Sequence, residues 1–189
     1  MSRYSQRTLL QQPSVANWGK AGGSPAAKVP ASITYSVTAG NGGGGGAQFA
    51  YPFGGGSGCG GTNSSGTYTT LGARDYYVVV GAGGTAGVST NTGACASNGG
   101  AGGSSTFGIY TASGGGGGQG ACGNHGGNCG GGGGQATAGN AGSVVMTYTQ
   151  TDTTELATIP AGLTYSLSTN AVAGSYRYTF TAGAGLVQF

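Results

Sequence analysis

The chain has 189 residues, of which 47 are glycine and only 5% are charged. Because average proteins contain about 7% glycine and about 25% charged residues, this composition excludes an ordinary charged globular surface as well as a highly charged disordered tail. The net charge of +3 comes mostly from the first 28 residues, which hold Arg3, Arg7, Lys20 and Lys28. A nucleic-acid partner is not expected, since basic residues do not recur along the rest of the chain.

Residues 1–26 predict an N-terminal arm, because they show neither helical nor strand periodicity. A flexible leader and an arm that orders on a partner are both open interpretations. In the second case the anchors are the basic and large apolar side chains of the arm, Arg3, Tyr4, Arg7, Leu9, Leu10 and Trp18. No run in the chain approaches the roughly 18 to 20 apolar residues of a membrane span, so membrane insertion is not expected.

Residues 27–53 are predicted to form a β-hairpin. The stretch AKVPASITYSV begins at Ala27, and its alternation of apolar and polar residues over Ile33 to Val37 is typical of a half-buried strand. Phe49, Tyr51 and Phe53 alternate in the same way and supply the second strand.

The same pattern returns at residues 150–189. ATIPAGLTYSL, from Ala157 to Leu167, is identical to AKVPASITYSV at six of eleven positions, and an alternating aromatic strand through Tyr178 follows it. We interpret this as an internal repeat, so residues 150–189 form a second hairpin related to the first. Two such hairpins can bury their apolar faces on each other or on a neighbouring chain. A chance likeness of two alternating strands is the alternative.

Residues 54–149 form a glycine-rich domain in which short apolar runs at 76–80, 105–110 and 143–148 predict β-strands. Helix is excluded, because each interior glycine costs about 1 kcal/mol relative to alanine. The glycine tracts are either flexible linkers or polyglycine II-type strands, which are extended threefold segments that pack with backbone against backbone. Because alanine, serine, threonine and amides interrupt the glycines, we expect the ordered, all-β alternative.

Four stretches in this domain carry a resemblance. YVVVGAGG from Tyr77, NGGAGGSSTFG from Asn98, TASGGGGG from Thr111 and GNAGSVVMTY from Gly139 follow one another. In this order they resemble the glycine-rich domain of bacteriophage tail fibres and related virion proteins, over about residues 54–149. Tyr176 to Thr181 is also similar to a strand that accompanies this domain. The resemblance implies a layered sandwich of polyglycine-type strands, here on a β-hairpin base, whose exposed loop ends touch a host receptor.

The function expected from this resemblance is that of a virion surface protein, assembled in the host cytoplasm and displayed on the extracellular particle. Its partners would be other virion proteins of the fibre, baseplate or capsid, and a host surface glycan or protein. A capsid decoration or cement protein without receptor binding is the alternative, since the chain shows no long fibre stalk. Fibres are commonly threefold, but no coiled-coil heptads enforce a homotrimer.

The candidate receptor contacts fall into two groups. Asn124, His125 and Asn128 lie between two five-glycine runs and form the polar tip of that tract. Tyr68 and Tyr110 lie near glycine turns, and tyrosine offers a large contact area at modest entropic cost. Burial of these tyrosines between sheets is the alternative.

The four cysteines, Cys59, Cys95, Cys122 and Cys129, allow three disulfide pairings. We expect a local Cys122–Cys129 bond with Cys59–Cys95 as the second, and free buried thiols are the alternative. A metal site is not expected, because the spacing of Cys122, His125 and Cys129 misses the usual zinc frameworks. Neither an enzyme nor a cofactor is expected, because the chain has only three acidic residues and one histidine and lacks the nucleotide-binding glycine motifs.

Overall fold

The computed structural model describes residues 28–48, 54–70, 75–92, 94–122, 136–150, 155–169 and 172–189. The predicted N-terminal arm, with Arg3, Tyr4, Arg7, Leu9, Leu10 and Trp18, lies outside them. Within the described residues there are strands and no helix: β1 Ser32–Thr38, β2 Asn63–Thr69, β3 Asp75–Val79, β4 Ser105–Phe107, β5 Tyr110–Ala112, β6 Ser143–Thr149, β7 Thr164–Ser168, β8 Ser175–Ala182 and β9 Ala184–Gln188. The prediction of an all-β protein is therefore confirmed.

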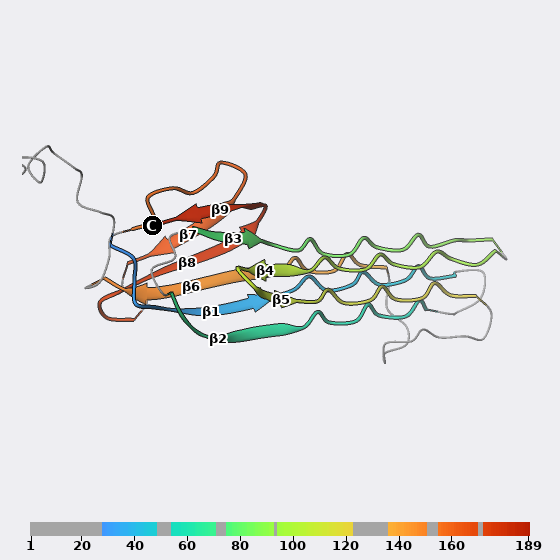
Figure 1. Cartoon of the computed structure of the whole chain (residues 1–189). Helices are drawn as coiled ribbons and strands as arrows, with labels where there is room; N and C mark the ends of the chain where they lie inside the picture. The colour runs from blue at the N-terminus through green and yellow to red at the C-terminus, as the bar shows by residue number, and fades with distance from the viewer. Residues whose placement is uncertain are drawn as a thin grey trace, which may run out of the picture.

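The strands form two antiparallel sheets that pack together like a sandwich (Figure 1). The first sheet has five strands in the order β2-β1-β6-β8-β7, and the second has four in the order β5-β4-β3-β9. Most neighbours in these sheets are distant in sequence: β1 pairs with β6 over Thr34 to Thr38, and β3 pairs with β9 along its whole length. The fold thus depends on contacts between segments far apart in the chain.

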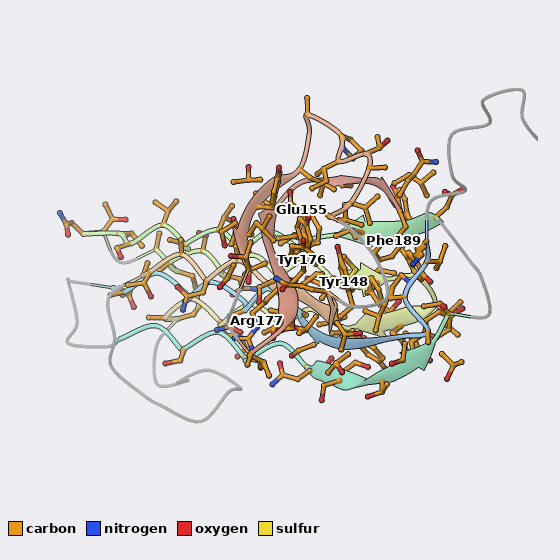
Figure 2. All side chains as sticks on the ribbon, turned by 90° about the vertical axis from the view of Figure 1, so that its left-hand side faces the viewer. Tyr148, Glu155, Tyr176, Arg177 and Phe189 are labelled. Carbon is orange, nitrogen blue, oxygen red and sulfur yellow. A yellow bond between two sulfur atoms is a disulfide. The ribbon has the colours of Figure 1, made fainter. Side chains whose placement is uncertain are left out.

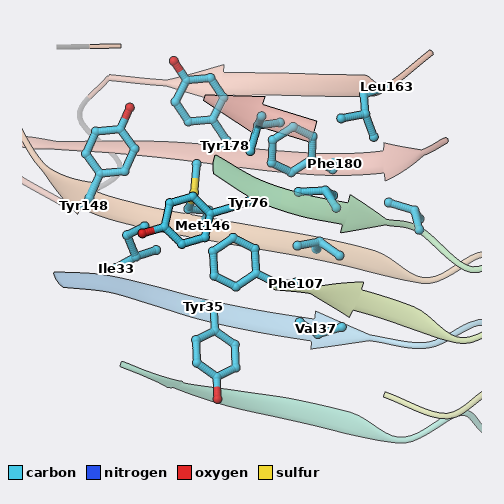
Figure 3. Packing of buried hydrophobic residues seen from close by; sticks show 14 of the residues in the cluster. Ile33, Tyr35, Val37, Tyr76, Phe107, Met146, Tyr148, Leu163, Tyr178 and Phe180 are labelled. Atoms are coloured by element: carbon cyan, nitrogen blue, oxygen red, sulfur yellow. The ribbon is translucent and has the colours of Figure 1, made fainter. Parts of the chain in front are cut away.

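Alternation along the strands builds the core between the two sheets (Figure 3). In β1 the side chains of Ile33, Tyr35 and Val37 are buried, as the sequence predicts. Val144, Met146 and Tyr148 of β6 are buried beside them, and Tyr76, Val78 and Phe107 cover them from the second sheet. Each fully buried side chain of this size contributes about 1.5–3 kcal/mol, so the sandwich holds the apolar core of the chain.

The C-terminal strands join the two sheets. β8 belongs to the five-stranded sheet and β9 to the four-stranded sheet, and Gly183 between them has a φ of 92°. A residue with a side chain rarely adopts this left-handed conformation, so glycine allows the chain to cross here. Phe189 then closes the core, with its ring 4.9 Å from that of Tyr148 in an edge-to-face arrangement (Figure 2).

The two sequence repeats lie in the same sheet but in different surroundings. β7 and β8 pair directly, where the sequence predicts the second hairpin. β1, by contrast, has β2 on one side and β6 on the other, so neither edge is open to a partner within residues 27–53. The strand predicted around Phe49 to Phe53 lies outside the described residues. The equivalent tyrosines consequently differ, because Tyr35 is buried and Tyr165 is 46% exposed at the sheet edge.

Six glycine-rich segments extend from one end of the sandwich and lie side by side, each continuing a strand (Figure 1). They are segment I (39–48, after β1), segment II (54–62, before β2), segment III (80–90, after β3), segment IV (95–104, before β4), segment V (113–122, after β5) and segment VI (136–142, before β6). The described part of these six segments contains no charged residue.

Segment I is the central member of this bundle. Its N–H groups donate in turn to segments II, IV and VI, and its carbonyl oxygens accept from segments III and V. Each neighbour is reached once every three residues: Gly40, Gly43 and Gly46 donate to Gly103, Gly100 and Ser97 of segment IV. The glycine-rich packing therefore begins before residue 54, and it is held together by backbone hydrogen bonds in place of apolar side chains.

Candidate functional site

The two groups of predicted receptor contacts have different places in the fold. Tyr68 is in β2 and Tyr110 begins β5, so both belong to the sandwich. Asn124, His125 and Asn128 lie outside the described residues, in the stretch that follows Cys122 at the far end of segment V. Ten residues of extended chain separate Ala112 from Cys122, or about 31 Å at the threefold extended rise of roughly 3.1 Å per residue.

The structure brings Tyr68 and Tyr110 together in an aromatic pocket. Their ring centroids are 6.0 Å apart in an edge-to-face arrangement, and the Tyr110 ring stacks on Tyr35 at 4.2 Å. Tyr76 stacks on Phe107 at 5.4 Å and meets Tyr68 edge to face at 5.9 Å. The pocket has a volume of about 160 Å³ and is lined by Tyr68, Asp75, Tyr76, Phe107, Gly108, Ile109 and Tyr110.

Two glycines shape the surroundings of this pocket. Gly108 has a φ of 57° in the tight turn between β4 and β5, and this turn leaves the side chain of Ile109 83% exposed at the pocket. Gly66 of β2 faces Tyr35, where a Cβ would lie 3.2 Å from the Tyr35 hydroxyl oxygen. The missing side chain at Gly66 thus leaves room for the Tyr35 ring on which Tyr110 stacks.

Two of the pocket tyrosines, Tyr76 and Tyr110, stay neutral around pH 7. Burial raises the pKa of Tyr76 to about 12, and the neighbouring Tyr68 adds to this rise. The pKa of Tyr110 is also raised, by desolvation first and then by Tyr35. Asp75, at the rim, accepts a hydrogen bond of 2.9 Å from Gln188. The pocket therefore offers ring faces and neutral hydroxyl groups, which suit stacking against a sugar ring or an apolar group.

The far ends of the glycine segments are fastened to one another. The side-chain amide of Gln48, at the end of segment I, donates to the backbone oxygen of Ala94 at 3.1 Å. A disulfide joins Cys95 of segment IV to Cys122 of segment V, with 4.4 Å between their Cα atoms. Gln48 is 3% exposed, so this end of the bundle is well packed.

The Cys95–Cys122 bond corrects the predicted local pairing. Because Cys122 is joined to Cys95, the expected bonds Cys122–Cys129 and Cys59–Cys95 are both wrong. The physical reason is that segments IV and V are antiparallel neighbours, and the Ala96 N–H donates to the Ala121 oxygen next to the bridge. Cys59 is also disulfide-bonded, and Cys129 lies outside the described residues.

The described residues contain no group of three or more His, Cys, Asp and Glu residues placed to hold a metal ion. No helix among them has the length and apolar character needed to cross a membrane.

Most of the chain, residues 18–187, matches the protein family described as "Glycine-rich domain". The chain belongs to this glycine-rich domain family. No curated protein and no solved structure matches it significantly. The match extends on both sides of residues 54–149, in agreement with the central position of segment I in the bundle.

Within this glycine-rich domain, sequence reasoning missed the residues that complete the aromatic pocket and fasten the segment ends. Tyr35 and Tyr76 each occupy the buried phase of an alternating strand, and that phase is a signal that they are buried. Gln48 is the amide that ends the glycine run of segment I. A long polar side chain at the end of a glycine run is a signal for a hydrogen bond that ties this end to a neighbouring part of the chain.

Proposed function

We propose that this glycine-rich domain is displayed on a bacteriophage particle, as a tail-fibre or tip adhesin, and that it binds a host surface receptor through its loop ends. The proposal rests first on the four ordered motifs that resemble those of phage tail-fibre domains. Family membership supports the glycine-rich domain itself, and the role on a particle is our inference.

We further propose that segments I to VI are polyglycine II-type strands. The hydrogen bonds support this, because segment I reaches segments II, IV and VI by rotation through three successive residues. A threefold extended helix repeats every three residues, so the bonding period and the helix period agree. Such a bundle is stiff, since its members are joined to neighbours along their length.

The observation that carries the adhesin proposal is the fastening of the segment ends far from the sandwich. Gln48 and the Cys95–Cys122 bond tie three segments together at this end. The chain passes from Cys122 to Ala136 through the predicted tip residues, so it leaves from and returns to a fixed base. Binding loops on a rigid scaffold lose less entropy when they bind than loops on a flexible one.

The test is host adsorption by particles that carry Asn124→Ala, His125→Ala and Asn128→Ala together. We expect adsorption to fall at least tenfold while the melting temperature of the purified chain and the yield of particles stay unchanged. Asn63→Ala, at the exposed start of β2, is the matched control. Unchanged adsorption with the triple variant would remove the adhesin proposal.

A second candidate, a capsid decoration or cement protein, is favoured by a separate observation. Tyr77 of β3 and Leu186 of β9 are direct cross-strand partners on the outer face of the four-stranded sheet, and they are 52% and 42% exposed. An exposed apolar pair of this kind is suited to contact with another protein. If Tyr77→Ser with Leu186→Ser releases the chain and weakens the shell, while adsorption by the tip variant is normal, the cement function is the better one.

A further inference from the structure

Arg177 is a single positive charge among hydroxyl-bearing side chains on the outer face of the five-stranded sheet. In β8 it directly precedes the buried Tyr178, so alternation along the strand turns it away from the core. Its cross-strand partner in β6 is Thr147, and the partner of Thr147 in β1 is Thr34. The five strands of this sheet carry no other charged residue. This row across the sheet therefore places a guanidinium beside hydroxyl groups.

A hollow opens beside Arg177 on this face, with a volume of about 300 Å³. It lies at the end of the sandwich opposite the glycine segments, where β1 and β8 begin and β6 ends. Hydroxyl-bearing side chains dominate its lining, which includes Ser32, Thr34, Thr147, Thr149 and Ser175. The two carboxylates of the described residues, Asp75 and Glu155, do not line it. The hollow thus combines one cation with several groups that both donate and accept hydrogen bonds.

One wall of the hollow is a tight turn that hydrogen bonds hold in place. Val172 lines the hollow, and its backbone oxygen accepts the N–H of Ser175 at 3.0 Å and the Ser175 hydroxyl at 2.6 Å. Gly174, within this turn, accepts the N–H of Gln150 at 2.8 Å and so ties the turn to the end of β6. The wall is therefore formed before any ligand arrives, which lowers the entropic cost of binding.

The guanidinium of Arg177 has no partner among the described residues. Its side chain makes no hydrogen bond or ion pair with them, and its Nε atom is buried without an acceptor. A buried N–H without an acceptor is unfavourable, because it has given up water and gained nothing in return. The side chain as a whole is partly exposed, so rotation about its bonds can bring the Nε–H edge to the hollow. Ligand oxygens in the hollow then pair the N–H groups that the chain leaves unpaired.

We propose that this hollow binds an acidic saccharide, with an oxyanion of the sugar on Arg177 and sugar hydroxyl groups on the serine and threonine side chains. A carboxylate and a phosphate each offer two oxygens to the N–H fork of a guanidinium, so either oxyanion suits Arg177. The hydroxyl groups of Thr34 and Thr147 make no hydrogen bond to another described residue, and they match the donors and acceptors of a sugar.

The size and the position of the hollow define the proposal further. Its volume lies at the lower end of the roughly 300–1,000 Å³ that small-molecule sites occupy, which is more than an isolated ion needs. The site is at the opposite end of the molecule from the fastened ends of the glycine segments. The proposal therefore does not depend on the adhesin function, and its test is a separate one.

Isothermal titration calorimetry of the purified chain tests the site with glucuronate, glucose 6-phosphate, glucose and acetyl-glutamate amide. Glucose lacks the charge, and acetyl-glutamate amide lacks the sugar ring. We expect glucuronate or glucose 6-phosphate to bind at least tenfold more tightly than these two, and the tighter charged sugar identifies the oxyanion. Absence of binding by both charged sugars overturns the proposal. Equally tight binding of acetyl-glutamate amide would mean that the hollow takes a carboxylate on any carrier, and it overturns the assignment to a saccharide.

Substitution of Arg177 locates the binding. Arg177→Met keeps much of the side-chain length without the charge and should weaken binding at least tenfold, whereas Arg177→Lys should weaken it less, because an ammonium keeps the charge but lacks the fork. Lys28→Met is the matched control, since it removes the same charge from an exposed residue outside the hollow. Its affinity should stay within twofold of wild type. Equal losses in Lys28→Met and Arg177→Met would assign the attraction to net charge and overturn the site.

A measurement on the wild-type chain decides the question even if the variants fail to fold. The Nε–H of Arg177 gives its own signal in a nitrogen–proton NMR spectrum, and it is assigned through the backbone signals of the same residue. On addition of the tighter charged sugar, this signal should shift and its exchange with water should slow at least threefold, because the N–H gains an acceptor. The Nε–H signals of the other arginines should stay in place. An unchanged Arg177 signal at saturating sugar contradicts the site.

Discussion

Gly43 and Thr85 are packed so closely that a Cβ on Gly43 would lie 1.9 Å from the backbone oxygen of Thr85. Neither residue can move away on its own, because the Gly43 N–H donates to Gly100 and the oxygen of Thr85 accepts from the same residue, Gly100. Glycine at position 43 is therefore required by the distance between backbones.

We expect Gly43→Ala to lower the free energy of unfolding by about 3 kcal/mol, the upper range for overpacking in a well-packed interior. Gly44→Ala is the matched variant, one residue away in the same run. A Cβ on Gly44 would lie 3.5 Å or more from every neighbour, so the unfolding free energy of this variant should stay within about 1 kcal/mol of wild type, with a small gain from the stiffer unfolded chain. Urea unfolding at low protein concentration measures both. Equal effects at the two positions would contradict the packing of segment I.

The order in the glycine tracts follows from composition, but the arrangement of the tracts does not. Asn41 and Ala47, which interrupt the glycines of segment I, each lie three residues from Gly44. Side chains at this spacing indicate that every third residue faces away from close neighbours. Which segment lies beside which is set by bonds such as Gly43 to Gly100, across a long stretch of chain. Local pattern holds no information on such pairings, and for the same reason the sequence predicts a partner for β1 within residues 27–53 and does not predict its observed partners β2 and β6.

The Cys95–Cys122 bond should appear as a linked pair of peptides when the unreduced chain is digested and analysed by mass spectrometry. The two cysteines are 27 residues apart, and closing a loop of this length stabilises the folded state by about 3.5 kcal/mol in the chain-entropy estimate. Cys95→Ser with Cys122→Ser should lower the unfolding free energy by about this amount. Recovery of a linked Cys122–Cys129 peptide from the wild-type chain would show that no disulfide joins segments IV and V.

Ser105 provides a test of the junction between strands and glycine segments. Its buried hydroxyl oxygen accepts the N–H of Gly81 at 2.9 Å, where segment III begins. Ser105→Ala leaves that N–H without an acceptor, so we expect a loss of about 1–3 kcal/mol in unfolding free energy. Ser104→Ala is the control, because Ser104 is exposed and its contact to Gly114 is a long 3.4 Å. A similar loss of unfolding free energy in both variants would mean that the hydrogen bond from Gly81 to Ser105 is not what stabilises this junction.

Part of the candidate site can be predicted from the sequence, for a physical reason. Tyr68 and Tyr110 lie near glycine turns, and the turn at Gly108 does leave the pocket open beside Tyr110. Tyr68 lies in the first sheet, whereas Tyr110 and the neighbouring Tyr76 and Phe107 lie in the second. Packing of one sheet on the other brings these rings together, and a single strand's alternation shows only that a side chain is inside.

Tyr76 predicts how the stability of the sandwich changes in alkaline solution. Its pKa is raised from 10.0 to about 12 by burial, so the unfolded chain loses this proton more readily than the folded one. The stabilisation is fully present below pH 10 and is lost as the pH rises toward 12. We expect the unfolding free energy of wild type to fall over this window, and to fall less steeply in Tyr76→Phe. Urea unfolding at intervals from pH 8 to 12 measures the slopes.

Tyr77→Phe is the control for this prediction. Tyr77 is 52% exposed on the opposite face of β3, so this substitution should leave the slope unchanged. A Tyr76→Phe slope equal to that of wild type would mean that the phenol is not buried as the structure places it.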